Sequence, residues 1–226
     1  MKGFAEAGDR RLPAAAGGGP LPPMLELPEG DFAGYIFDCD GTLADSMPIH
    51  FRAWHHAFTQ HGARFRFDWE LFYSLAGVGH RDSVELLNER FADTLDPAAV
   101  IATQAERLET SFHEVGPIEP VVTIARELAA VHPVSVGSGS SRRHVLAALE
   151  AIGMAEFFEH IVSKDDVSRS KPDPETFLRC AELMGVAPDR CLVFEDGALG
   201  LEAAQSAGMA TVFVDADRFG RRVEIT

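Results

Sequence analysis

Basic residues are scarce in this sequence. Its 226 residues include 20 lysines and arginines against 35 aspartates and glutamates, which gives a formal net charge of −15. Nucleic-acid binding relies on basic side chains that displace phosphate counterions, so this balance opposes it, and it equally opposes docking on anionic membranes. An anionic substrate would therefore need positive charge from a bound cation or from a few well-placed basic residues.

Cysteines and long apolar runs are also scarce. The cysteines Cys39, Cys180 and Cys191 are odd in number and lack CxxC spacing, which is typical of free thiols in a reducing compartment. No apolar run approaches the ~20 residues of a membrane span, and the N-terminus lacks the apolar stretch of a secretory signal. We therefore expect a cytoplasmic protein, and a monomer or weak dimer.

The first thirty residues differ in composition from the rest. Hydrophobic residues make up 46% of the chain and charged residues 24%, which is ordinary for a globular enzyme. The stretch 1–30, however, contains eleven glycines and prolines. A segment of this composition buries too little apolar surface to offset the entropy lost on ordering. It is predicted to be a flexible N-terminal tail.

Five short apolar runs predict the strands of a sheet: Tyr35–Phe37, Val134–Gly137, His160–Val162, Cys191–Phe194 and Thr211–Val214. Helix-length segments separate the later runs; "RHVLAALEAIGM" and "PETFLRCAELMG" have apolar residues on one helical face, and Gly208 is a plausible helix C-cap. Strands that alternate with helices indicate a parallel sheet covered on both faces, with ligands at the carboxyl ends of the strands.

Residues 48–116 interrupt this alternation. The stretch 50–62 carries Phe51, Trp54 and Phe58 on one helical face, and helices are predicted over Asp82–Phe91 and Ala98–Phe112. No strand is predicted there. The fold class is therefore α/β, with a core formed by 31–47 and 117–226 and an all-helical insert, 48–116, directly after the first strand.

Polar side chains follow four of the predicted strands. They are Asp38 and Asp40 after the first, Ser138 with Gly139 after the second, Lys171 in the loop after the third, and Glu195 with Asp196 after the fourth. Because the carboxyl ends of parallel strands lie at one edge of a sheet, these residues are expected to meet.

This set suits phosphoryl transfer through a covalent aspartyl-phosphate. Asp38 would attack phosphorus, and Asp40 would protonate the leaving oxygen and then deprotonate water. Mg²⁺ prefers oxygen ligands, which Asp38, Asp196 and the backbone near Asp40 would supply, with Glu195 as a ligand or orienting the metal's waters. Ser138, Gly139 and Lys171 would bind the phosphate.

Other interpretations of these residues are weaker. "DCDG" alone could be a turn or a calcium loop, but an EF-hand needs downstream acidic residues that the sequence does not supply. Cys39 is expected to pack in the core and not to act as a nucleophile. Asp45 is expected to stabilise the turn after the strand. The histidines of 55–61 lack zinc-site spacing.

"DCDGTLADS", the Ser138 strand end, "KPDPETF" and "FEDGALGLEAAQSAGM" resemble the four motifs of the haloacid dehalogenase superfamily, over residues 33 to 215. The resemblance implies a Rossmann-like, three-layer core with a helical cap inserted after the first strand, which agrees with the element pattern. "HFRAW" and the later motifs are most similar to the branch of β-phosphoglucomutases and small sugar-phosphate phosphatases, in particular the fructose-1-phosphate phosphatase type.

The resemblance also implies roles for cap residues. His50 would face the active site and Arg81 would contact substrate, while His80 stands where mutases tend to carry an arginine, and Gln104 where they carry a lysine. A mutase must grip a second phosphate, so these departures favour a phosphatase, and Asp40 argues against a dehalogenase. We predict a Mg²⁺-dependent phosphatase of a small sugar or polyol phosphate. The alternatives are a β-phosphoglucomutase-like isomerase and a non-catalytic ligand- or partner-binding relative, which would have lost a catalytic group.

Overall fold

A five-stranded sheet lies at the centre of the computed structural model, which describes residues 25, 27–75 and 78–215. The strands are β1 (Gly34–Phe37), β2 (Val134–Gly137), β3 (His160–Val162), β4 (Cys191–Glu195) and β5 (Ala210–Phe213). Their spatial order is β3-β2-β1-β4-β5, and every neighbouring pair is parallel. The carboxyl end of β1 therefore lies between those of β2 and β4. The five predicted strands are confirmed, but β1 begins one residue earlier than predicted, at Gly34, β4 extends to Glu195, and β5 begins and ends one residue earlier than predicted.

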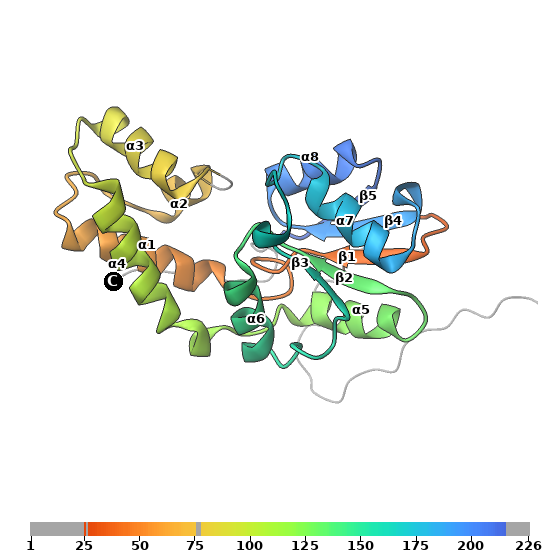
Figure 1. Cartoon of the computed structure of the whole chain (residues 1–226). Helices are drawn as coiled ribbons and strands as arrows, with labels where there is room; N and C mark the ends of the chain where they lie inside the picture. Colours follow the sequence, from red (N-terminus) through yellow and green to blue (C-terminus); the bar gives the residue numbers. More distant parts are fainter. Residues whose placement is uncertain (1–24, 26, 76–77, 216–226) are drawn as a thin grey trace, which may run out of the picture.

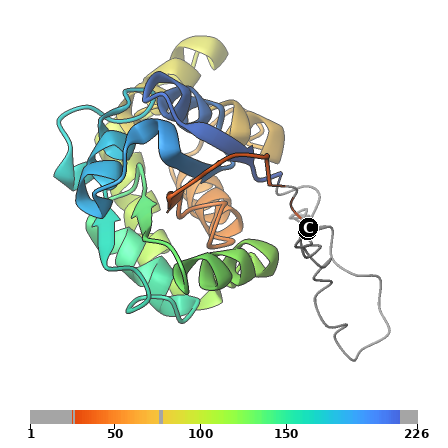
Figure 2. The same ribbon diagram turned by 90° about the vertical axis from the view of Figure 1, so that its right-hand side faces the viewer.

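Two helices cover each face of the sheet: α5 (Glu119–Ala129) and α6 (Arg142–Ala151) on one, α7 (Glu175–Met184) and α8 (Ala198–Ser206) on the other. Successive residues of β1 point to opposite faces. Tyr35 and Phe37 belong to the apolar cluster with α5 and α6, whereas Ile36 packs in the cluster with α7 and α8. Figure 2 shows α5 and the C-terminal helices on opposite sides of the sheet. The α/β, three-layer prediction is confirmed.

Four further helices, here called the cap helices, lie between β1 and β2 in the sequence: α1 (Met47–Gln60), α2 (Trp69–Ser74), α3 (His80–Phe91) and α4 (Pro97–Glu109). They enclose a separate apolar cluster that includes the predicted face of α1, Phe51, Trp54 and Phe58. Figure 1 shows them gathered beyond one end of the sheet. The 3₁₀ helices are η1 (Phe112–Glu114), η2 (Lys164–Asp166) and η3 (Pro188–Arg190).

The segments that connect the sheet to the cap helices run side by side. The amide of Asp45 donates to the carbonyl of Gly116 at 2.9 Å, and the amide of Ile118 donates to the carbonyl of Leu43 at 2.9 Å. These bonds hold the entry to and exit from the cap helices together. The division into tail, core and cap at residues 30, 47 and 116 stays a prediction, and residues 1–24 and 26 of the predicted tail lie outside the described part.

Several helix boundaries differ from prediction. Helix α3 begins at His80, two residues before the predicted Asp82, and α4 begins at Pro97, one residue before the predicted Ala98. The helix predicted over Ala98–Phe112 ends at Glu109, because the hydroxyls of Thr110 and Ser111 donate to the carbonyl of Arg107 and the chain turns into η1. Gly208, predicted as a C-cap, lies one residue beyond the cap of α8, with a φ of +77°. Helices α2 and α5 were not identified individually. Among the described helices, none combines the length and apolarity needed to cross a membrane.

Candidate active site

A tight turn follows β1 and carries the two aspartates of "DCDG". The amides of Leu43 and Ala44 both donate to the carbonyl of Cys39, and the amide of Gly41 donates to the carbonyl of Ala44. Gly41 has a φ of +85°, a conformation that glycine adopts without a Cβ clash. Asp38 is thereby fixed at the centre of the sheet edge, with its amide bonded to the carbonyl of Phe194 in β4.

Lys171 joins the ends of two strands. Its ammonium group donates to Asp38 Oδ1 and to Glu195 Oε2, each at 2.7 Å, and lies 4.7 Å from the centre of the Phe177 ring. Burial alone would lower the pKa of Lys171, but the two carboxylates outweigh it and raise that pKa. The structure therefore brings together two of the predicted carboxylates around a lysine that stays charged.

The carboxylates of Asp38, Glu195 and Asp196 converge, with an oxygen of each within 4.8 Å of the others. Burial and the nearby Glu195 raise the pKa of Asp38 well above its ordinary value, against the effect of Lys171, and raise the pKa of Asp196 to about 8. Two negative charges remain uncompensated when all three are ionised beside Lys171. Such a cluster of hard oxygen donors with excess negative charge fits Mg²⁺.

Asp40 is held apart from this cluster. Its Oδ1 accepts a hydrogen bond from Ser46 Oγ and its Oδ2 one from Ser140 Oγ, both at 2.6 Å, and His50 Nε2 lies 3.6 Å from Oδ1. Burial alone would raise the pKa of Asp40, but the His50 imidazole and the two hydroxyls outweigh it and hold that pKa well below its ordinary value. The Asp40 carboxylate lies outside the group of three, and the predicted metal ligand at this position, the backbone near Asp40, stays a prediction.

The loop after β2 approaches Asp40 through Ser140. Ser138 is buried, and its hydroxyl accepts a hydrogen bond from the amide of Ser140 at 3.0 Å, which orients the Ser140 hydroxyl toward Asp40. Gly139 is exposed, and a Cβ there would meet no atom within 4 Å. The predicted phosphate-binding pair thus lies at the edge of the site, but Ser140, for which no role was predicted, makes the contact with Asp40.

The two predicted cap residues differ in their positions. His50 lies beside Asp40, as expected. Arg81 is exposed and its nearest acidic partner is Glu85 on its own helix, at 3.5 Å, whereas the neighbouring His80 lines the pocket. Because α3 begins at His80, a shift of one residue turns the side chain by about 100° around the helix. The structure therefore does not place Arg81 in the site.

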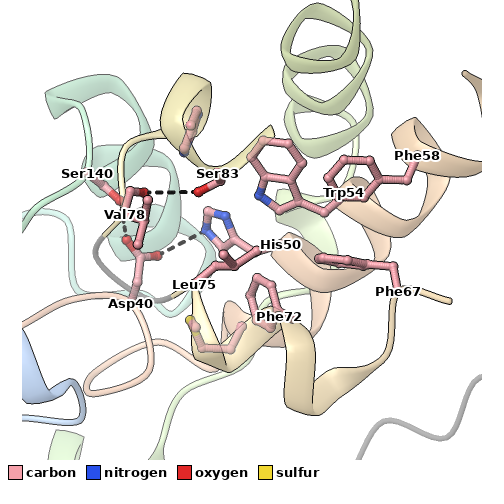
Figure 3. A pocket seen from close by; sticks show the side chains of 12 residues that line it. Asp40, His50, Trp54, Phe58, Phe67, Phe72, Leu75, Val78, Ser83 and Ser140 are labelled. Atoms are coloured by element: carbon pink, nitrogen blue, oxygen red, sulfur yellow. Dashed lines mark hydrogen bonds and ion pairs between the residues drawn. The ribbon is translucent and has the colours of Figure 1, made fainter. Parts of the chain in front are cut away.

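A pocket of about 200 Å³ lies between the sheet edge and the cap helices. Asp40 and Ser140 line it from the core and ten residues of the segment 47–83 line it from the cap, among them His50, His80 and Ser83. Figure 3 shows Asp40 and Ser140 at one side of the pocket and the rings of Trp54, Phe58 and Phe67 at the other. The aromatic side was predicted only as cap core.

The comparison with known families agrees with this geometry. A family model of haloacid dehalogenase-like hydrolases matches residues 32–208, most of the chain and all four strand ends of the site. The chain belongs to the haloacid dehalogenase-like hydrolases. The resemblance stated from the sequence motifs is thereby confirmed.

Individual relatives of this haloacid dehalogenase-like hydrolase include sugar-phosphate enzymes. The fructose-1-phosphate phosphatase YqaB of Escherichia coli (strain K12) is 34% identical over 81% of this chain and 96% of its own length. The phosphorylated carbohydrates phosphatase of Thermotoga maritima is 30% identical over 79% of this chain and 82% of its own. The crystal structure of a putative β-phosphoglucomutase from Thermotoga maritima superposes with a TM-score of 0.63 at 27% identity, covering 79% of this chain and 82% of that chain.

The Gly41→Ala variant tests whether the turn of this haloacid dehalogenase-like hydrolase positions Asp196. A Cβ at Gly41 would lie 2.1 Å from Asp196 Oδ2, so the variant must displace that carboxylate. We expect at least a ~100-fold loss of activity, since small displacements of catalytic groups cost about that much.

Gly153→Ala is the matched control, because Gly153 also has a positive φ (+67°) but faces open space. It should lose only the ~1–2 kcal/mol of stability of a left-handed alanine. Equal activities of the two variants in a phosphate-release assay would contradict this role.

Proposed function

We propose that the protein is a Mg²⁺-dependent phosphatase that hydrolyses a small sugar or polyol phosphate through an aspartyl-phosphate on Asp38. Family membership and phosphatases among the relatives support phosphoric monoester hydrolysis. The observation that carries the mechanism is the separation of the acidic groups. Asp38 shares Lys171 with Glu195, while Asp40 is held on serine hydroxyls and beside His50.

In the first step, an oxygen of the Asp38 carboxylate attacks phosphorus and the bond from phosphorus to the alcohol oxygen breaks. Lys171 holds the Asp38 carboxylate in place and offsets the charge that gathers on the phosphoryl oxygens. Asp40 gives a proton to the departing alcohol oxygen. Mg²⁺ held by Asp38, Asp196 and Glu195 would supply further charge neutralisation and Lewis acidity when bound.

Asp40 must therefore gain a proton before it can donate one. Without substrate its carboxylate is held ionised by His50, Ser46 and Ser140. The dianionic phosphate of a bound substrate adds negative charge beside Asp40 and raises its pKa, since like charges favour the protonated carboxyl. In the second step Asp40 takes a proton from water as that water attacks phosphorus, and the bond from phosphorus to the Asp38 oxygen breaks, which releases inorganic phosphate and regenerates the carboxylate.

A mutase is the second candidate, since it would use the same aspartyl-phosphate. It must bind a phosphate at the far end of its substrate, for which basic residues are needed. The described residues that line the pocket include no lysine or arginine. This composition supports hydrolysis.

The cytoplasmic location and the monomeric or weakly dimeric state stay predictions.

A panel of sugar and polyol phosphates, assayed separately for free phosphate and for isomerised sugar phosphate, tests the proposal. We expect inorganic phosphate in proportion to substrate consumed, with Mg²⁺ required. Isomerised product without release of phosphate would establish the mutase instead, and no turnover of any member or of p-nitrophenyl phosphate would refute the phosphatase.

Metal binding should depend on pH in a defined direction. In the metal-free protein, burial, Glu195 and Asp40 raise the pKa of Asp196 to about 8, against Lys171. A raised carboxyl pKa contributes stability that is complete below the unfolded value of ~3.9 and is lost as pH rises through about 8. We expect the melting temperature of the metal-free protein to fall between pH 5 and pH 8.5 more than that of Asp196→Asn. Added Mg²⁺ should raise the wild-type melting temperature more at pH 8.5 than at pH 6.5, because fewer protons must be displaced. An equal Mg²⁺ shift at both pH values would contradict this.

A further inference from the structure

The pocket beside Asp40 has two chemically different ends. Five of its twelve lining residues are polar and seven are apolar, and three of the apolar ones are phenylalanines. Figure 3 shows Ser83, His50 and Val78 toward the side of Asp40, and Phe58, Phe67 and Phe72 away from it, with Trp54 between. A substrate whose phosphate reaches the strand ends would therefore meet polar groups first and an aromatic wall beyond them.

The polar end offers few partners to substrate hydroxyls. Both Asp40 oxygens already accept hydrogen bonds, and the Ser140 hydroxyl is the donor of one of them. Ser83 Oγ donates to the carbonyl of Val78 only at 3.5 Å, a distance at which a substrate oxygen can replace it. His80 stands edge-on to the Trp54 ring, 5.2 Å between centroids. Hydroxyls near the phosphate can thus be satisfied by Ser83 and the two histidines of the pocket.

The apolar end offers none. It is lined by side chains without hydrogen-bonding groups: Phe58, Phe67 and Phe72. Phe58 and Phe67 are 2% and 5% exposed, and their ring centroids lie 4.7 Å apart, so the wall is packed and cannot readily turn aside. A hydroxyl placed against it would lose its hydrogen bonds to water and gain none, whereas a methyl or methylene group would be favourably buried.

The charge of the lining excludes a second anionic group at this end. Asp40 is negative, and lysine and arginine are both missing from the lining within the described residues. The volume of about 200 Å³ is below the ~300–1,000 Å³ of typical ligand pockets, so the alcohol part of the substrate is small.

We infer that the preferred substrate is a monophosphate of a small neutral alcohol that bears hydroxyls on the carbons near the phosphate and an apolar group, such as a methyl, at its far end. A terminally deoxygenated sugar or polyol phosphate has this form. The inference rests on the proposed phosphatase function, and narrows its substrate class by the group of phenylalanines at the end of the pocket away from Asp40. Phe58, Phe67 and Phe72 then act as specificity-determining residues.

Two matched pairs of substrates test this on the full chain with Mg²⁺: fructose 1-phosphate against 6-deoxyfructose 1-phosphate, and xylulose 5-phosphate against 1-deoxyxylulose 5-phosphate. Each pair differs by one hydroxyl at the end remote from phosphate. We expect the deoxy member to have the higher kcat/KM by about 10- to 100-fold, the range over which an apolar pocket separates such pairs. Fructose 1,6-bisphosphate should be poorer than both hexose monophosphates.

Equal or higher kcat/KM for the fully hydroxylated members, with p-nitrophenyl phosphate still hydrolysed, would overturn this inference alone. Failure to hydrolyse p-nitrophenyl phosphate and all four sugar phosphates would overturn the phosphatase function and the inference with it.

A variant pair gives a second measurement. Phe72→Tyr places a hydroxyl at the apolar end, and should reduce the ratio of kcat/KM within each pair to near one. Phe91→Tyr makes the same change at a phenylalanine that is 37% exposed on α3 and does not line the pocket, so it should keep the wild-type ratio. An unchanged ratio in a folded Phe72→Tyr protein would contradict the assignment. Should that variant not fold, the wild-type pairs still decide.

Discussion

The Asp38→Asn variant should lose at least about 10⁴-fold in kcat while keeping its fold, a loss of the size seen when a nucleophile is removed. The amide oxygen of asparagine is a poor nucleophile and cannot form the acyl phosphate. Lys171 would keep Glu195 as a partner at 2.7 Å, so the ammonium group is not left without a counter-charge. The loss should therefore concern chemistry and not assembly of the site.

The stability of this variant gives a second, independent readout. Burial and Glu195 raise the pKa of Asp38, which means that the metal-free fold favours an uncharged side chain at this position. Asparagine supplies one. We expect the melting temperature of the metal-free variant at pH 8.5 to equal or exceed that of the wild type, and its stabilisation by Mg²⁺ to be smaller.

Asp189→Asn is the matched control. Asp189 is exposed in η3, just before β4 begins. It therefore lies at the amino end of this strand, whereas the site residues lie at the carboxyl ends of the strands. The identical substitution there should change neither kcat nor the Mg²⁺ response. Trapping the wild-type enzyme in acid during turnover should yield a protein heavier by one phosphoryl group, and Asp38→Asn should give none. A phosphorylated Asp38→Asn protein, or one with wild-type turnover, would show that another residue is the nucleophile.

The sequence predicted the sheet edge well because the signal there is local. Each of the site residues Asp38, Ser138, Glu195 and Asp196 directly follows or ends an apolar run of three to five residues, and parallel pairing then brings them to one edge without further information. Lys171 is farther from its strand, in the loop after the third, and it was predicted at the same edge from its place after that strand. The structure puts it between Asp38 and Glu195.

The partners of Asp40 could not be predicted in this way. Ser46 and Ser140 lie six and one hundred residues from it, and nothing in the sequence pairs their hydroxyls with Asp40. The second hydroxyl in "VGSGS" was the available signal for Ser140. For the cap, helical periodicity identified the apolar face of α1 but not which of its side chains border a pocket, since that depends on how α2 and α3 pack over it. The prediction that Arg81 contacts substrate is limited in the same way, because its neighbour His80 lines the pocket and Arg81 does not.

The Asp40→Asn variant should separate the two halves of the reaction. Asparagine keeps the size of Asp40 and can still contact Ser46 and Ser140, but it neither gives nor takes a proton at the required moment. General acid–base catalysis contributes about 10²–10⁴-fold, so steady-state kcat should fall by that factor for every substrate, because all of them share the hydrolysis of the Asp38 phosphate.

The rate of the first step, unlike that of the second, should depend on the leaving group. p-Nitrophenolate departs without a proton, whereas a sugar alkoxide needs one. In Asp40→Asn, rapid mixing with p-nitrophenyl phosphate should therefore give a burst of p-nitrophenolate of about one equivalent per active site, followed by slow turnover. A sugar phosphate should give no burst of its alcohol. Asp189→Asn should behave as wild type with both substrates. Absence of the burst would mean that Asp40 serves the first step in some way other than proton donation, and an unchanged kcat would remove it from the chemistry. Because the burst depends on the leaving group alone, a general distortion of the site by the substitution cannot produce it, and the outcome assigns the proton to Asp40 itself.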